Sequence, residues 1–211
     1  MHRHIALFDL DGVVFDTEPQ YTLFWGSQFK KYYPQDPGLE HKVKGMTLVQ
    51  IYDMYFNDQP QKQADITREL NDFEVNINYE YVAGFEQFIS KLRSLGIKTA
   101  VVTSSNREKM ENVYAKHPEF KTYFDEVLTS EDFAKSKPDP DCYLKAAQKF
   151  GANVDECVGF EDSFNGLKSL RGANMAIVGL ATTNSKETIS EYADKVIDNY
   201  VGINPSDVFF E

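Results

Sequence analysis

The chain has 211 residues, enough for one large domain or for a core with a small inserted unit. It carries 33 acidic against 22 basic residues, a net charge of −11, which argues against nucleic acid or an anionic membrane surface as the main partner. Apolar residues make up 42% of the chain, which excludes a disordered protein. The two cysteines show no metal or disulfide spacing, no apolar run approaches a membrane span, and the N-terminus is no signal peptide, so we expect a cytoplasmic monomer.

The first predicted element is a buried strand at residues 5–8, which runs directly into Asp9, Asp11 and Gly12. Open α/β sheets keep their ligands at the carboxyl ends of their strands, so this carboxylate pair stands where a ligand would bind. Residues two apart in a strand share a face, so both carboxylates can face one substrate. Alternatively, a bend at Gly12 exposes one backbone carbonyl. The same DxDG pattern also occurs in calcium loops and ordinary turns.

A helical block follows, from about residue 17 to residue 80. Asp16 or Thr17 can cap its first helix, with Pro19 in the first turn. A second helix begins near Thr47, and a third covers about 61–77. Aromatic residues recur on these helices, and helical spacing favours a role in the block's own core over stacking on a ligand. The residues in question include Tyr52, Tyr55 and Phe56.

From about residue 82 the pattern becomes an alternation of helices and strands, which predicts a parallel sheet with helices on both faces. Expected strands are 97–103, 124–128, 157–160, 175–178 and 195–197. Expected helices include 85–95, one around Met110, 139–150, one that ends near Arg171, and 186–193.

Polar residues follow three of these strands. Thr103 ends the second strand and precedes Ser104 to Asn106; Lys137 lies in a proline-rich loop; Glu161 and Asp162 end a later strand. Each has an ordinary explanation, because Thr103 and Asp162 can cap helices and Lys137 can be an exposed loop lysine. An anionic phosphate in so acidic a chain requires local cations, and a hard cation requires oxygen ligands.

Four stretches together resemble, in order, the four signatures of the haloacid dehalogenase (HAD) superfamily. They are FDLDG at 8–12, VVT at 101–103, KPDP at 137–140 and GFEDSFNG at 159–166. The resemblance implies an α/β fold, with a Rossmann-like parallel-sheet core at 1–16 and 82–211. It also implies an inserted all-helical cap domain at 17–81.

The resemblance further implies a mechanism. Asp9 would be the nucleophile, Asp11 the acid and base, and Thr103 and Lys137 the groups that hold the phosphoryl oxygens. Mg²⁺ would be held by Asp9, the Asp11 carbonyl and Asp162, with Glu161 binding it directly or through water. Substrate contacts would come from four further residues, namely Ser104, Asn106, Lys44 and Gly45.

Within the family, the chain is most similar to the β-phosphoglucomutase-like subgroup, which has a small helical cap. The mutases carry a histidine and an arginine where this chain has Tyr21 and Leu48. Hydrolysis of a small phosphorylated metabolite, such as a sugar phosphate, is therefore favoured over mutase activity. Dehalogenase members lack a carboxylate at the Asp11 position, so Asp11 argues against that activity. A non-catalytic binding protein on the same scaffold is the remaining alternative.

Overall fold

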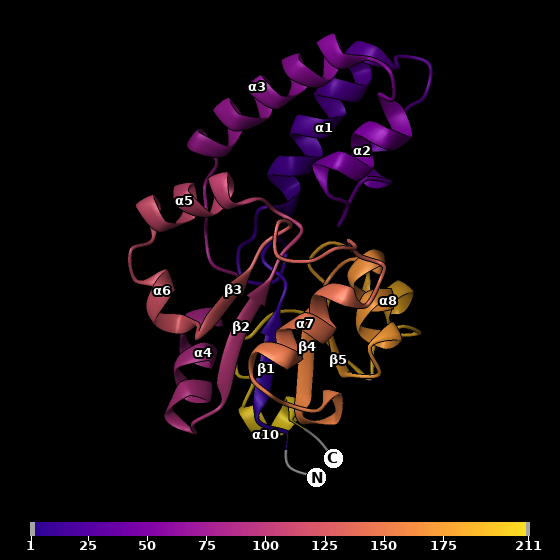
Figure 1. The fold of residues 1–211 in the computed structure, drawn as a ribbon. Helices are drawn as coiled ribbons and strands as arrows, with labels where there is room; N and C mark the ends of the chain where they lie inside the picture. Colours follow the sequence, from indigo (N-terminus) through magenta and orange to yellow (C-terminus); the bar gives the residue numbers. More distant parts are fainter. Residues whose placement is uncertain (1–2, 210–211) are drawn as a thin grey trace.

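The computed structural model has at its centre a six-stranded parallel sheet in the order β3-β2-β1-β4-β5-β6 (Figure 1). It describes residues 3–209, so residues 1–2 and 210–211 of the expected core lie outside the described residues. The strands are β1 (Ile5–Phe8), β2 (Lys98–Val102), β3 (Glu126–Leu128), β4 (Cys157–Glu161), β5 (Ala176–Leu180) and β6 (Lys195–Ile197).

Side chains of β1 alternate between two hydrophobic clusters because successive residues of a strand point to opposite faces. Ala6 and Phe8 belong to one cluster, and Ile5 and Leu7 to the other. β1 pairs with both β2 and β4, so it is buried on both faces and along both edges. A strand in this position reads as a continuous apolar run, which is why the sequence pattern identified it.

Helices cover both faces of the sheet, and the predicted fold class is confirmed. The first cluster is closed by α4 (Phe85–Ser94), α5 (Arg107–Lys116), α6 (Phe120–Tyr123) and α10 (Pro205–Val208). The second is closed by α7 (Asp141–Lys149), α8 (Phe164–Gly172) and α9 (Lys186–Ile189). A short 3-10 helix, η2 (Val154–Glu156), leads into β4.

The remaining helices form a separate layer above the carboxyl ends of the strands (Figure 1). They are α1 (Glu18–Tyr32), η1 (Leu39–His41), α2 (Leu48–Tyr55) and α3 (Pro60–Asn76). We call residues 17–81 the cap. Its aromatic residues pack on one another in a hydrophobic cluster of its own, as the helical spacing predicted.

Two chain segments connect the cap to the core, and they run side by side. Phe15 forms an isolated β-bridge with Tyr81. On either side of it, the Asp16 amide donates to the Glu80 carbonyl at 2.8 Å, and the Val82 amide donates to the Val14 carbonyl at 2.9 Å. The paired backbones hold the base of the cap in register with the end of β1.

Two local predictions are wrong. The helix expected at 186–193 ends at Ile189, although Tyr192 and Ala193 still pack on the core beside it. Thr17 occupies the N-cap position of α1, but its side chain makes no capping hydrogen bond and contacts Asp11 instead. None of the helices described for residues 3–209 combines the length and hydrophobicity needed to cross a membrane.

Candidate active site

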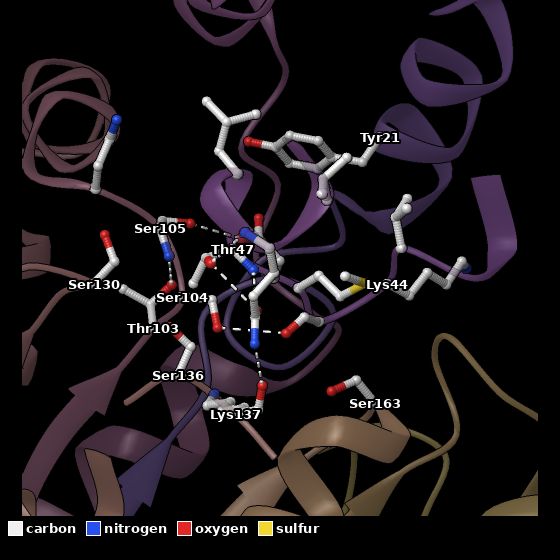
Figure 2. Close-up of a pocket in the computed structure, with 18 of the residues that line it drawn as sticks. Tyr21, Lys44, Thr47, Thr103, Ser104, Ser105, Ser130, Ser136, Lys137 and Ser163 are labelled. Atoms are coloured by element: carbon white, nitrogen blue, oxygen red, sulfur yellow. Dashed lines mark hydrogen bonds between the residues drawn. The ribbon is translucent and has the colours of Figure 1, made fainter. Parts of the chain in front are cut away.

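The sheet places the predicted residues at one edge. The backbone continues the strand pairing beyond β1 and β2, since the Asp9 amide donates to Phe160 at 3.0 Å and the Thr103 amide donates to Leu128 at 2.9 Å. The side chains that end neighbouring strands therefore converge below the cap. Figure 2 shows Thr103, Ser104, Lys137 and Ser163 around a single hollow.

Lys137 lies at the bottom of this hollow and is only 1% exposed. Its ammonium donates to Asp9 Oδ1 and Glu161 Oε1, each at 2.6 Å, and to the Val102 carbonyl at 2.9 Å. Burial by itself lowers the pKa of Lys137, but the negative charges of Asp9 and Glu161 outweigh this and hold the pKa above its usual value. Lys137 is therefore a permanent cation beside the Asp9 carboxylate.

The carboxylates around Lys137 are short of positive charge. Burial, followed by the charge of Glu161, raises the pKa of Asp9 to about 7, although Lys137 opposes the shift. Burial and the charges of Glu18, Glu161 and Asp9 raise the pKa of Asp162 well above its ordinary value. Only a hydroxyl, that of Thr183, donates to the Asp162 side chain among the described contacts. The cluster is thus poised to accept a further cation.

The donor set fits a hard divalent ion. Asp9, Glu161 and Asp162 each offer a carboxylate oxygen, and these oxygens lie within 4.8 Å of one another. Glu161 is the most occupied of the three, because it also accepts from Tyr143 at 2.8 Å and from the Asp162 amide at 3.1 Å. Asp9 and Asp162 are therefore the better placed direct ligands, and Glu161 fixes the Lys137 ammonium and the local backbone.

The Asp11 side chain turns toward Thr17, where the chain enters the cap (the cap linker), instead of toward the carboxylate cluster. Its two oxygens accept from Thr17 Oγ1 at 2.5 Å, from Ser105 Oγ at 3.2 Å and from the Lys109 ammonium. One of these donors belongs to the cap linker and two to the segment that follows β2. The orientation of Asp11 thus depends on how the cap meets the core.

Lys109 is a site residue that the sequence analysis missed. It is 2% exposed, although it lies only three residues beyond the N-cap of α5. Its ammonium lies 4.4 Å from the ring centre of Tyr21 in the cap, and the Tyr21 hydroxyl donates to Glu74 at 2.8 Å. Burial raises the pKa of Glu74, and the nearby Lys109 partly offsets the shift. The short distance in sequence between Lys109 and Thr103 was the signal that could have identified Lys109 as a site residue.

Cap and core together enclose a cavity of about 530 Å³. Its walls contain every predicted site residue except Glu161, which lies beneath the floor. Lys44 lies 3.6 Å from Glu18, and Gly45 approaches Ser104 and Ser163 of the core. The Asn106 side chain is partly committed elsewhere, because it caps α5 by accepting from the Lys109 amide at 2.9 Å.

A cavity between cap and core with a largely buried carboxylate, a paired lysine and an acidic cluster is suited to chemistry on an anionic ester. The sequence model of the haloacid dehalogenase-like hydrolases matches residues 4–174. The chain belongs to this family. The match spans all four motifs and the whole cap.

Individual relatives are distant. The chain is 25% identical over 203 residues to the bifunctional riboflavin kinase/FMN phosphatase of Arabidopsis thaliana. The aligned region includes 94% of this chain but only 54% of that protein, so the chain spans about half of that relative's length. It is 26% identical over 187 residues to the fructose-1-phosphate phosphatase YqaB of Escherichia coli, covering 82% and 93% of the two chains. The structure of β-phosphoglucomutase from Clostridium difficile has a TM-score of 0.79 at 22% identity, covering 98% and 95%, which shows a shared fold.

Proposed function

We propose that this HAD-family enzyme is a Mg²⁺-dependent phosphatase that hydrolyses a small phosphomonoester, with sugar phosphates as the substrate class. The proposal is carried by the position of Asp9, whose carboxylate lies at the bottom of the cap–core cavity, held by Lys137 and next to Asp162. A nucleophile beside a permanent cation and a cation-binding cluster meets the needs of phosphoryl transfer, which are positioning and charge neutralisation.

In the first step, an Asp9 oxygen attacks phosphorus and the ester P–O bond breaks, leaving an aspartyl phosphate. Asp11 gives its proton to the departing oxygen, and Thr103 and Lys137 hold phosphoryl oxygens. In the second step, Asp11 takes a proton from water, the water oxygen attacks phosphorus, and Asp9 is released with inorganic phosphate. Mg²⁺, held by Asp9, Asp162 and the Asp11 carbonyl, would offset the negative charge that Asp9 and the phosphate bring together.

The activities of two relatives, named as phosphatases of FMN and of fructose 1-phosphate, support a small phosphorylated metabolite as substrate. A mutase is the second candidate, favoured by the likeness to a β-phosphoglucomutase structure. Two lining residues oppose it. Leu48 offers no charge to a second phosphate, and the hydroxyl of Tyr21 is engaged with Glu74. Water is therefore the preferred second acceptor.

The test is phosphate release with Mg²⁺ across a panel of hexose, pentose and nucleoside phosphates, with glucose 6-phosphate formation from β-glucose 1-phosphate assayed in parallel. D9N should abolish turnover while the protein remains folded, and D36N, on an exposed cap turn, should behave like the wild type. Formation of glucose 6-phosphate faster than free phosphate would refute the phosphatase assignment in favour of the mutase. Full activity of D9N would remove Asp9 as nucleophile.

A further inference from the structure

A single side chain links the cap to the backbone of the catalytic lysine. Gln50 stands in the first turn of α2, and its Nε2 donates to the Lys137 carbonyl at 2.9 Å. The two residues are 87 positions apart in the chain, one in the cap and one in the core. The bond thus exists only when the cap lies against the core in the arrangement seen here.

The other end of the same amide is fixed within the cap. Gln50 Oε1 accepts from the backbone N–H of Thr47 at 2.8 Å. In return, Thr47 Oγ1 accepts from the backbone N–H of Gln50 at 3.3 Å, which completes a capping box at the start of α2. This capping box orients the side chain of Gln50 before it meets the core. A side chain held in advance loses little conformational entropy when it forms the second bond.

The loop that precedes α2 also touches the core. Gly45 has a φ of 72°, and a Cβ at this position would lie 2.5 Å from Ser163 Oγ. Ser104 Oγ donates to the Gly45 carbonyl at 3.5 Å, a long contact. Gly45 therefore permits the close approach, and Gln50 supplies the stronger directional bond.

We propose that Gln50 is a positioning residue that holds the cap closed by tying it to the Lys137 backbone, an inference that rests on the proposed phosphatase function. The side-chain amide of Gln50 suits this role because it accepts at one end and donates at the other. A glutamate in its place retains the acceptor that caps α2. It has no donor for the Lys137 carbonyl at neutral pH, and it brings a negative charge toward that oxygen.

Q50E therefore separates closure of the cap from stability of the cap. The loss of one hydrogen bond should lower kcat/KM for p-nitrophenyl phosphate about three- to tenfold. Q50A, which adds no charge, should be impaired at least as much. The matched control is Q63E, because Gln63 Nε2 donates to the Phe56 carbonyl at the same 2.9 Å but wholly within the cap. Q63E should retain wild-type kinetics.

A second measurement reports closure without turnover. Trp25 is the single tryptophan of the chain, lines the cavity and is 7% exposed. In Mg²⁺ and inorganic phosphate, acrylamide should quench its fluorescence more strongly in Q50E and Q50A than in the wild type or Q63E. Thermal melting should show that Q50E remains folded.

The outcomes separate the two proposals. Equal quenching in Q50E and Q63E overturns the role of Gln50 in closure, even if the activity of Q50E falls, because the loss would then have another cause. Wild-type kinetics in Q50E overturns it as well. A wild-type protein that releases no phosphate from any ester refutes the phosphatase, while the quenching comparison still decides the role of Gln50.

Discussion

Replacement of Lys137 by methionine should show how strongly the buried charges depend on one another. The Lys137 and Glu161 side chains are 1% and 0% exposed, and both ion-pair distances of the ammonium are 2.6 Å. Removal of one partner from such a group leaves buried charge uncompensated, at a cost of about 3–5 kcal/mol. For a chain of this size the loss corresponds to a fall of roughly 6–20 °C in the melting temperature.

The assay is thermal unfolding of K137M at pH 8 and pH 5.5 without metal, beside the single variant E161Q and the double variant K137M/E161Q. The loss should be smaller at pH 5.5, because Asp9, whose pKa burial raises to about 7, then carries a proton and adds no buried charge. E161Q removes one of the stranded charges and should restore part of the stability at pH 8. A loss of less than about 1 kcal/mol in the free energy of unfolding of K137M at pH 8 would refute this expectation. A double variant that loses more stability than the two single variants together would refute it as well.

Three further predictions concern the cation, Asp11 and the cap. Burial raises the pKa of Asp9 to about 7, so the stability that protonated Asp9 contributes at low pH is lost as the pH rises through 7. Mg²⁺ binds the ionised carboxylate, so it should raise the melting temperature more at pH 8 than at pH 5.5. Equal shifts at the two pH values would contradict this. K109M removes the ammonium that donates to the Asp11 carboxylate, so the orientation of Asp11 is lost and kcat/KM from initial rates should fall about ten- to hundredfold. An unchanged rate would show that Lys109 is dispensable. G45A should push the cap away from Ser163 and lower kcat/KM, and it should also lower the melting temperature because alanine is strained at the positive φ of Gly45; wild-type rates would show that the loop can yield.

Three of the residues that the sequence identified were found because each ends a strand or directly follows one. Asp9, Thr103 and Asp162 come at or just after the ends of β1, β2 and β4, and parallel strands bring these ends together without any knowledge of the packing. Lys137 could be identified from the sequence for a different reason, because the KPDP pattern is itself unusual. Local pattern and topology were therefore enough to assemble the centre of the site.

The residues that the sequence did not reveal depend on the cap meeting the core. Lys109 looks like any exposed lysine in the first turn of a helix, and it is buried because Tyr21 of α1 lies over it. Gln50 looks like an ordinary capping-box residue, and its second hydrogen bond goes to a loop 87 residues away. No local pattern encodes contacts of that kind.

The helix expected at 186–193 failed for a related physical reason. Ile189, Tyr192 and Ala193 have the spacing of an apolar helix face, and all three pack against the second cluster of the sheet. A chain that leaves the helix after Ile189 still delivers the next two side chains to the same surface, so the burial pattern persists without helical backbone. Periodicity reports which side chains are buried, and the backbone follows from it only when the element is long.

The carboxylate network explains why cap position and chemistry are coupled in this protein. Asp9 is held from the core alone, by Lys137, whereas Asp11 is held by donors from both the cap linker and the core, Thr17 and Lys109 among them. Movement of the cap therefore leaves the proposed nucleophile, Asp9, in place but changes the surroundings of the proposed proton donor, Asp11. In the proposed mechanism, the contact between cap and core therefore sets the orientation of Asp11, and a closed cap also limits access of water to Asp9.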